Sequence, residues 1–165
     1  MTYADGSTFE GEWRADNRHS GTFIQKGVKY QPIKGLSNFK NEKMHGSGKI
    51  TWTSGANYSG QWREGKRNGK GKMNYADGSS FNGTWLNDTP VSGTMKWPSG
   101  AKFRGKINSS KSQIAEYTMK DGSFYVGGWK NNVRVGQGRM VYANGDTYEG
   151  RYKHNQREGQ GTFTW

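Results

Sequence analysis

The feature that most constrains the fold is a five-residue motif. It has an aromatic residue at its first position, glycine at its third and a second large residue at its fifth. It recurs at intervals of 22 to 23 residues. The first ring is Phe9, Tyr58, Phe81, Phe103, Tyr125 or Tyr148, the glycine is Gly11, Gly60, Gly83, Gly105, Gly127 or Gly150, and the last residue is Trp13, Trp62, Trp85, Ile107, Trp129 or Tyr152. Because alternate residues of a strand share a face, both rings and the glycine point the same way. The regular spacing indicates a tandem repeat.

A second run follows in most copies and also repeats. It opens with Gly-x-Gly at Gly46/Gly48, Gly69/Gly71, Gly136/Gly138 and Gly159/Gly161, while one copy keeps only Gly93, and it ends on Trp52, Tyr75, Trp97, Tyr142 or Trp165. A turn sequence such as "ADG", "TSG", "PSG" or "ANG" then leads to the next motif. Two short alternating runs separated by Gly, Asn and Asp predict a β-hairpin. The chain is therefore expected to be a ladder of about seven hairpins.

Other short repeats fit less well. A propeller blade needs four strands and roughly 40 residues. Leucine-rich repeats have a suitable length, but leucine occurs only at Leu36 and Leu86. The adjacent Trp-Trp or Trp-Tyr pairs expected of cell-wall-binding repeats are absent from the sequence.

Composition favours a thin, aromatic structure over a thick core. Only 30% of the 165 residues are hydrophobic, yet there are 26 Gly, 7 Trp, 9 Tyr and 7 Phe. Aromatic residues bury a large area each, and a disordered chain would be poor in them. The lack of cysteine excludes a disulfide framework and a thiolate zinc site. No segment reads as a signal peptide or membrane span, so we expect a cytoplasmic protein.

The stretch "YSGQWREGKRNGKGKMNYADGSSFNGTW" resembles the MORN repeat, whose pattern is aromatic-x-Gly-x-Trp, a polar turn with Asn/His-Gly-x-Gly, and a second strand ending on an aromatic residue before Asp-Gly. The resemblance covers nearly the whole chain. It implies an all-β fold, an elongated single-layer antiparallel sheet of tandem hairpins that is twisted and curved into a groove. It also implies a non-catalytic role in protein or membrane association, often at cytoskeletal or ciliary structures.

On this basis residues 1–165 are expected to form one array. Its copies are anchored at Phe9, Tyr30, Tyr58, Phe81, Phe103, Tyr125 and Tyr148. Two copies depart from the pattern. The copy at Tyr30 carries an insert at 31–38 and has Phe39 at the tryptophan position, and the copy at Phe103 has Ile107 there and lacks both turn glycines over 107–118. Such departures in repeat proteins often mark a binding face.

The alternation predicts a face of rings and glycines opposite a polar face. Glycine leaves room for rings of neighbouring hairpins and lets the sheet bend. In a single-layer sheet part of the ring face should stay exposed, and an exposed apolar groove normally marks an interaction site. We therefore expect a helical or extended peptide to bind there, as an amphipathic helix does in a groove. The candidate anchors are Tyr58, Trp62, Phe81, Trp85, Phe103, Tyr125 and Trp129.

The formal net charge is +12, and residues 17–111 alone carry 17 basic and four acidic side chains, a net +13. Such a surface attracts acidic peptides or anionic lipid. The candidate basic residues are Lys72, Lys96, Arg104 and Lys106. An anionic-membrane or phosphoinositide-binding module is the alternative function. Nucleic-acid binding ranks last, because no recognised motif accompanies the rings.

Catalysis is not expected. The three histidines are His19, His45 and His154, and no Ser-His-Asp spacing, paired acids or phosphate-binding loop is present. One carboxylate in each Asp-Gly turn is too few for calcium, so no metal and no cofactor are expected. Tyr3 and Trp165 occupy the same phase of the repeat, so the chain starts and stops within a unit. Uncapped sheet edges of this kind predict end-to-end association or a longer protein.

Overall fold

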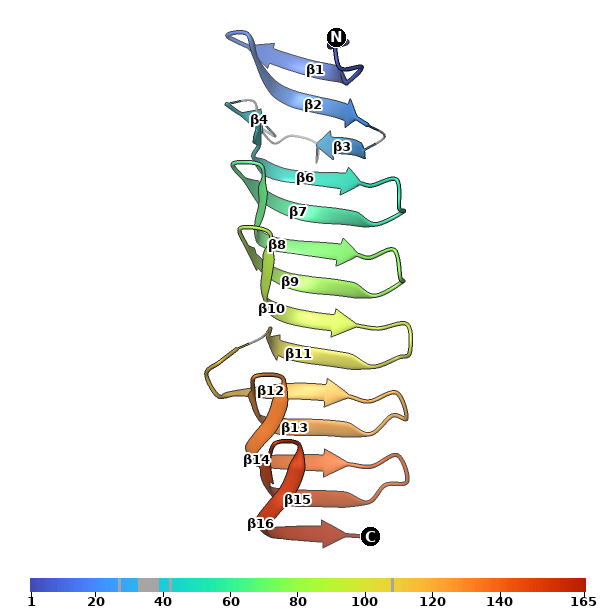
Figure 1. The fold of residues 1–165 in the computed structure, drawn as a ribbon, viewed down its shortest axis with the longest axis vertical. Coiled ribbons are helices and arrows are strands. Elements are labelled where there is room, and N and C mark those ends of the chain that lie inside the picture. Colours follow the sequence, from blue (N-terminus) through green and yellow to red (C-terminus); the bar gives the residue numbers. More distant parts are fainter. Residues whose placement is uncertain (27, 33–38, 42, 108) are drawn as a thin grey trace. The chain divides into compact units, whose positions relative to one another are not determined.

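The computed structural model describes residues 1–26, 28–32, 39–41, 43–107 and 109–165. All regular secondary structure in these ranges is β-strand, and the strands that pair are antiparallel (Figure 1). The chain divides into two compact units, residues 1–90 and 91–165.

In residues 1–90, seven strands form a sheet in the order β1-β2-β3-β6-β7-β8-β9. A separate short pair is formed by β4 (Phe39–Lys40) and β5 (Lys43–Met44). The seven strands are β1 (Thr8–Arg14), β2 (Asn17–Gln25), β3 (Val28–Pro32), β6 (Gly46–Thr51), β7 (Asn57–Arg63), β8 (Lys66–Asn74) and β9 (Ser80–Leu86).

In residues 91–165 the order is also that of the chain, β10-β11-β12-β13-β14-β15-β16. The first of these strands begins two residues before the unit. The strands are β10 (Thr89–Lys96), β11 (Lys102–Lys106), β12 (Gln113–Thr118), β13 (Phe124–Lys130), β14 (Val133–Val141), β15 (Thr147–Lys153) and β16 (Gln156–Thr164).

Two kinds of turn join the strands. At the hairpin tips a pair of residues takes positive φ, for example Asn131 at 48° and Asn132 at 62°. This conformation matches the right-handed twist of the strands, and asparagine tolerates it well. At the other end of the strands lie the Asp-Gly turns, in which Gly78 has a φ of 83°. There the Asp77 carboxylate accepts hydrogen bonds from the backbone N–H and the hydroxyl of buried Ser79, at 2.8 and 2.6 Å.

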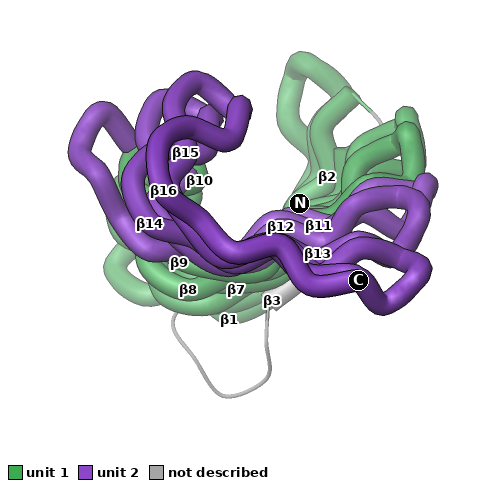
Figure 2. The backbone as a smooth tube through the Cα atoms, turned by 90° about the horizontal axis from the view of Figure 1, so that it is seen from below, with its two compact units in different colours: residues 1–90 green, residues 91–165 purple. Residues whose placement is uncertain are grey.

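A bulge bends most of the hairpins near the tip. The strand register shifts between Gly60 and Trp62 and again between Gly127 and Trp129. A bulge bends its strand and increases the local twist. Figure 2 shows the strands of residues 91–165, in purple, bending so that their tips curl over. In residues 1–90 the curled tip places the Arg67 guanidinium 4.5 Å from the Trp85 ring.

The repeated glycines lie beneath tyrosine rings. Tyr58 crosses Gly60 and Gly71, and its hydroxyl donates a hydrogen bond to the Gln61 carbonyl at 3.0 Å. A Cβ atom on either glycine would lie closer than 3.0 Å to this side chain. Real Cβ atoms do not approach so closely, so only glycine fits beneath the ring. Rings packed on bare backbone replace the second layer that a single sheet lacks.

The second large residue of the motif links neighbouring copies at Trp62, Trp85, Trp129 and Tyr152. Trp85 lies between Phe81 of its own copy and Tyr58 of the previous copy, with centroids 5.3 and 5.4 Å away and nearly perpendicular planes. Its indole N–H donates to the Gly71 carbonyl at 3.2 Å. Phe39 takes the same place between Tyr30 and Phe9, at 5.3 and 5.7 Å. Edge-to-face contacts of this kind add about 0.5–1.5 kcal/mol each beyond burial.

The predicted all-β sheet of tandem hairpins is confirmed. Residues 33–38 of the expected insert lie outside the described residues. In the other irregular copy, β11 and β12 pair over three residues, Lys102 to Arg104. The side chain of Gln113 then substitutes for the missing ladder, because it accepts from the Lys106 N–H at 2.7 Å and donates to the Lys106 carbonyl at 2.8 Å. That residues 1–165 form one array stays a prediction.

Candidate functional site

The seven rings that the sequence analysis assigns to a partner-binding groove are buried. Their exposed fractions run from 0% for Tyr58 and Tyr125 to 9% for Trp129, and the remaining four are Trp62, Phe81, Trp85 and Phe103. The curled hairpin tips and the rings of neighbouring copies cover them, which the alternation of residues does not reveal. The structure gives these rings a packing role. Their binding role stays a prediction, and it would require the tips to open.

Four arginines near the tips are functional candidates that the sequence analysis missed. Arg67 lies over Trp85, Arg134 is 5.3 Å from the Tyr152 ring, and Arg157 is 5.4 Å from the Tyr148 ring. Arg18 lies over Phe39, which is at the tryptophan position, at 5.0 Å, and over Phe23 at 4.4 Å. A cation over an aromatic face contributes about 0.5–2 kcal/mol. The signal was present, since three of these arginines stand two residues before a Gly-x-Gly pair.

Two of these arginines, Arg67 and Arg134, also hold the next hairpin tip. The Arg67 Nε donates to the Asp88 carboxylate at 3.0 Å, and its terminal nitrogen donates to the Asp88 carbonyl at 3.1 Å. Arg134 reaches the Asn155 carbonyl in the same way, at 3.0 Å. The planar guanidinium can stack on a ring and donate at its edge simultaneously. Arg67 and Arg134 therefore each fix the following hairpin tip against the rings.

The ring face of residues 91–165 contains an open groove, which we call the inner groove. It consists of two adjoining hollows of about 700 and 570 Å³ that share Asp121, Ser123, Tyr142 and Arg157. The rings at the ends of the second strands line it. Tyr142 and Phe163 are half-buried, with centroids 5.7 Å apart, and Trp165 is 93% exposed. The remaining lining residues are Met119, Arg134, Met140, Ala143, Asn144, Asp146, Tyr152, Asn155 and Gln156.

The inner groove combines aromatic surface with fixed charges. Arg134 and Arg157 lie over rings, while the Asp121 carboxylate accepts from the Ser123 N–H at 2.9 Å. Burial raises the pKa of Tyr152 to about 12, so this phenol is neutral at physiological pH. Aromatic side chains beside arginines suit an extended peptide that has apolar rings and carboxylates.

Residues 1–90 have a smaller hollow of the same kind. It has a volume of about 370 Å³ and includes Arg18, which lies over Phe23 and Phe39 at 4.4 and 5.0 Å. The other lining residues are Gln25, Lys26, Val28, Tyr30, Lys43, Met44, Ile50 and Gly65. An arginine on aromatic rings is thus a property of the repeat in both units.

The predicted basic residues are all exposed. Lys96, Arg104 and Lys106 lie on one face of β10 and β11 together with Lys102, which pairs with Lys96 and which the sequence analysis did not single out. Arg104 lies 3.7 Å from the Glu116 carboxylate. Lys72 lies on β8 between Ser59 and Asn82. Over the ranges described above, the structure contains no helix of the length and apolar character needed to cross a membrane.

Comparison with solved structures finds a similar fold. The TCP domain of Drosophila melanogaster SAS-4, solved in complex with a proline-rich motif of Ana2, matches with a TM-score of 0.53 and 11% identity over 100% of this chain and 94% of that domain. A point mutant of the TCP10 domain of Danio rerio CPAP matches with a TM-score of 0.33 and 12% identity, over 92% of this chain and 81% of that chain. Similarity at this level concerns the fold alone.

Comparison of the sequence identifies the family. No curated protein matches the chain significantly. The family model described as the MORN repeat matches residues 9–20, 37–56, 58–80, 125–147 and 148–165, which together make up more than half of the chain. The copies anchored at Phe81 and Phe103 lie outside these segments, although both form paired strands in the structure. The chain therefore belongs to the MORN-repeat family.

Proposed function

We propose that this protein is a non-catalytic scaffold that binds an extended peptide of a partner protein in the inner groove. The observation that supports this function is the row of partly exposed rings, Tyr142, Phe163 and Trp165, beside Arg157. Exposed apolar surface of this kind on a protein commonly serves an interaction. Tryptophan, tyrosine and arginine also contribute most to binding energy at interfaces.

A proline-rich or acidic segment is the partner chemistry that we favour. Proline-rich peptides dock on aromatic-lined grooves with little loss of conformational entropy, because their extended helix is preformed. The similarly folded Drosophila SAS-4 TCP domain was solved with a proline-rich motif. Arg134 and Arg157 would attract carboxylates on the same peptide.

Fluorescence anisotropy tests this proposal. We would titrate the whole chain into a labelled peptide with repeated Pro-x-x-Pro spacing and neighbouring glutamates, and into a scrambled proline-free control. Trp165→Ser should weaken binding about tenfold or more, since an interface tryptophan often contributes 2 kcal/mol. This side chain is 93% exposed, so folding should not change. Ile114→Ser, which also alters an exposed apolar residue outside the inner groove, is the matched control. Equal binding by the chain and by Trp165→Ser would refute the proposed groove.

A second candidate function is binding to anionic membranes, because Lys96, Lys102, Arg104 and Lys106 share one face. Each cation near an anionic surface contributes about 1 kcal/mol. Sedimentation with phosphatidylserine vesicles should therefore fall at high salt and in a Lys96→Glu/Lys106→Glu variant. Absence of sedimentation at low salt would eliminate this function.

The cytoskeletal or ciliary location implied by the family is part of the same proposal. Imaging of a fluorescently tagged chain alongside Trp165→Ser would test it. If the location depends on peptide binding in the inner groove, the Trp165→Ser variant should no longer be found there. An unchanged location would show that it does not depend on the inner groove.

A further inference from the structure

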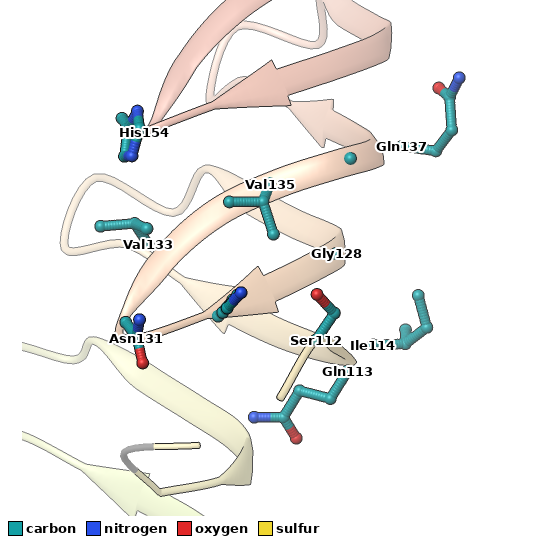
Figure 3. Close-up of a pocket in the computed structure, with 11 residues that line it drawn as sticks. Ser112, Gln113, Ile114, Gly128, Asn131, Val133, Val135, Gln137 and His154 are labelled. Carbon is teal, nitrogen blue, oxygen red and sulfur yellow. The ribbon is translucent and has the colours of Figure 1, made fainter. Parts of the chain in front are cut away.

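A second groove lies in residues 91–165 on the face opposite the rings, and we call it the outer groove. Ile114 projects there with 73% of its surface exposed, although its neighbour Ala115 is 2% exposed on the ring face. The outer groove has a volume of about 910 Å³, and Val133 and Val135 of β14 are half-buried in it (Figure 3). The other lining residues are Ser112, Gln113, Gly128, Lys130, Asn131, Gly136, Gln137 and His154.

One repeat position in the outer groove carries no side chain. In the copy at Tyr58 this position is Gln61, whose amide oxygen folds over the bulge and accepts from the Lys70 N–H at 2.8 Å. In the copy at Tyr125 the equivalent residue is Gly128, and the equivalent of Lys70 is Gln137. The other copies have Glu12, Thr84, Lys106 and Arg151 here.

Glycine changes both the shape and the polarity of this site. A Cβ on Gly128 would overlap the Val135 carbonyl oxygen, so the glycine lets the β14 bulge approach β13. Gly128 also cannot supply the acceptor that Gln61 provides to the bulge. A depression with apolar walls is therefore open beside the Gln137 backbone. An oxygen from another molecule can occupy the position that the Gln61 amide oxygen has in the regular copy.

Charge defines the occupant further. The lining residues include Lys130 and His154, both exposed, and no carboxylate. The acid nearest along β12, Glu116, lies 3.7 Å from Arg104. A groove with cationic and amide donors at its rim and aliphatic walls complements a carboxylate next to an apolar side chain.

We propose that the outer groove binds a short extended peptide of a partner protein, in which a leucine-like side chain packs on Ile114 and Val135 and a flanking carboxylate meets Lys130 and the Gln137 backbone. This surface is separate from the inner groove, so the protein connects two peptide segments. A protein with two peptide sites on opposite faces can bridge partners, and linked sites raise the overall affinity.

The test uses a labelled octapeptide with two central leucines flanked by glutamates, titrated with the whole chain. A lysine-flanked peptide and an alanine-centred peptide are the ligand controls. The leucine–glutamate peptide should bind best, and Ile114→Ser should weaken it about tenfold, which corresponds to the loss of one buried aliphatic contact. Lys130→Gln should weaken binding several-fold and reduce its dependence on salt. Both side chains are exposed, so neither change should alter the melting temperature.

Two further measurements locate the site. Amide resonances of Gly128 and Gln137 should shift when the peptide is added, whereas the Tyr142 resonance should not. Leu86→Ser, an exposed leucine of residues 1–90, and Trp165→Ser in the inner groove should both bind normally. The proposal is overturned if the peptide does not bind at about 1 mM protein, if the lysine-flanked peptide binds equally well, or if Ile114→Ser has no effect. The proposal for the inner groove is tested separately: it fails if Trp165→Ser binds the proline-rich peptide as well as the unchanged chain does.

Discussion

Replacement of Gly71 by alanine tests whether rings packed on glycine hold this fold together. Gly71 does not have a positive φ, so backbone conformation does not forbid alanine there. In an open strand the change would stabilise the protein by about 0.4–1 kcal/mol, because alanine restricts the unfolded chain. Here the new Cβ would overlap the Tyr58 ring and hydroxyl. The entropic effect would raise the free energy of unfolding and the overlap would lower it. Whether Gly71→Ala stabilises or destabilises the protein therefore distinguishes the two effects.

The Tyr58 ring cannot move away easily. Its hydroxyl bonds to the Gln61 carbonyl, and its centroid lies 5.1 Å from Trp62 and 5.4 Å from Trp85. Overpacking a fixed core of this kind costs about 1–3 kcal/mol. For a cooperative unit of 75–100 residues, a loss of about 2 kcal/mol lowers the melting temperature by roughly 10 °C.

Thermal and urea unfolding followed by circular dichroism would measure this effect. The neighbouring Lys72→Ala on the exposed face is the matched control and should change stability by less than about 0.5 kcal/mol. Tyr58→Leu alone should destabilise the protein, but it removes the side chain that the Gly71→Ala Cβ would overlap. The double variant Tyr58→Leu/Gly71→Ala should therefore be more stable, by about 1 kcal/mol or more, than the sum of the two single effects predicts. An unchanged or raised melting temperature for Gly71→Ala would refute the packing argument.

Three other changes should have measurable effects. Among the described residues the Tyr152 hydroxyl is buried without a hydrogen-bond partner, so Tyr152→Trp should raise stability by about 1 kcal/mol through an indole bond to the Gly138 carbonyl; lower stability in urea unfolding would contradict this. Arg67→Lys should lower stability by about 1–2 kcal/mol, because an ammonium cannot both stack on Trp85 and donate to Asp88 as the guanidinium does. Equal melting temperatures would show that the two simultaneous contacts of the guanidinium are unnecessary. Burial raises the pKa of Tyr125 and Tyr152 to about 12, and the unfolded phenols ionise near 10, as free tyrosine does. The folded state therefore keeps protons that the unfolded state loses as pH rises. The contribution of these two tyrosines to the free energy of unfolding should be fully present below pH 10 and be lost between pH 10 and 12. Because lysines titrate in the same range, Tyr125→Phe is the control and should show a smaller fall; an identical fall would assign the effect to the lysines.

Much of the fold was predictable because the repeat encodes local geometry. The spacing of Tyr58, Gly60 and Trp62 predicts a strand face, and the Asn-Gly and Asp-Gly sequences predict turns. Even Phe39 was correctly assigned to the tryptophan position, and the structure places it between two rings.

The sites were less predictable, because they depend on residues that are distant in sequence. Alternation identified the ring face but could not show that Arg67 and Arg134 would lie over it. Most motif rings are therefore buried, although Trp13 is 39% exposed. At the strand ends Tyr142 is half-buried and Trp165 is exposed. The outer groove depends on a comparison of Gly128 with Gln61, whose role became visible only through its hydrogen bond to Lys70.

The sequence by itself determined the period, the hairpins, the Asp-Gly turns and the residues that share each face, because these follow from the two-residue alternation of a strand and from the local conformation of glycine. The hairpin tip expected at Asn68-Gly69 instead lies at Glu64-Gly65, and Asn68 and Gly69 are within β8. Only the tertiary structure decided which face is covered. Bulges near Gly60 and Gly127 bend the hairpins, and Arg67 and Arg134 hold the hairpin tips at Asp88 and Asn155 against the preceding copy. Most rings of the repeat became its core for this reason, and the two proposed binding surfaces lie at the strand ends and beside Gly128.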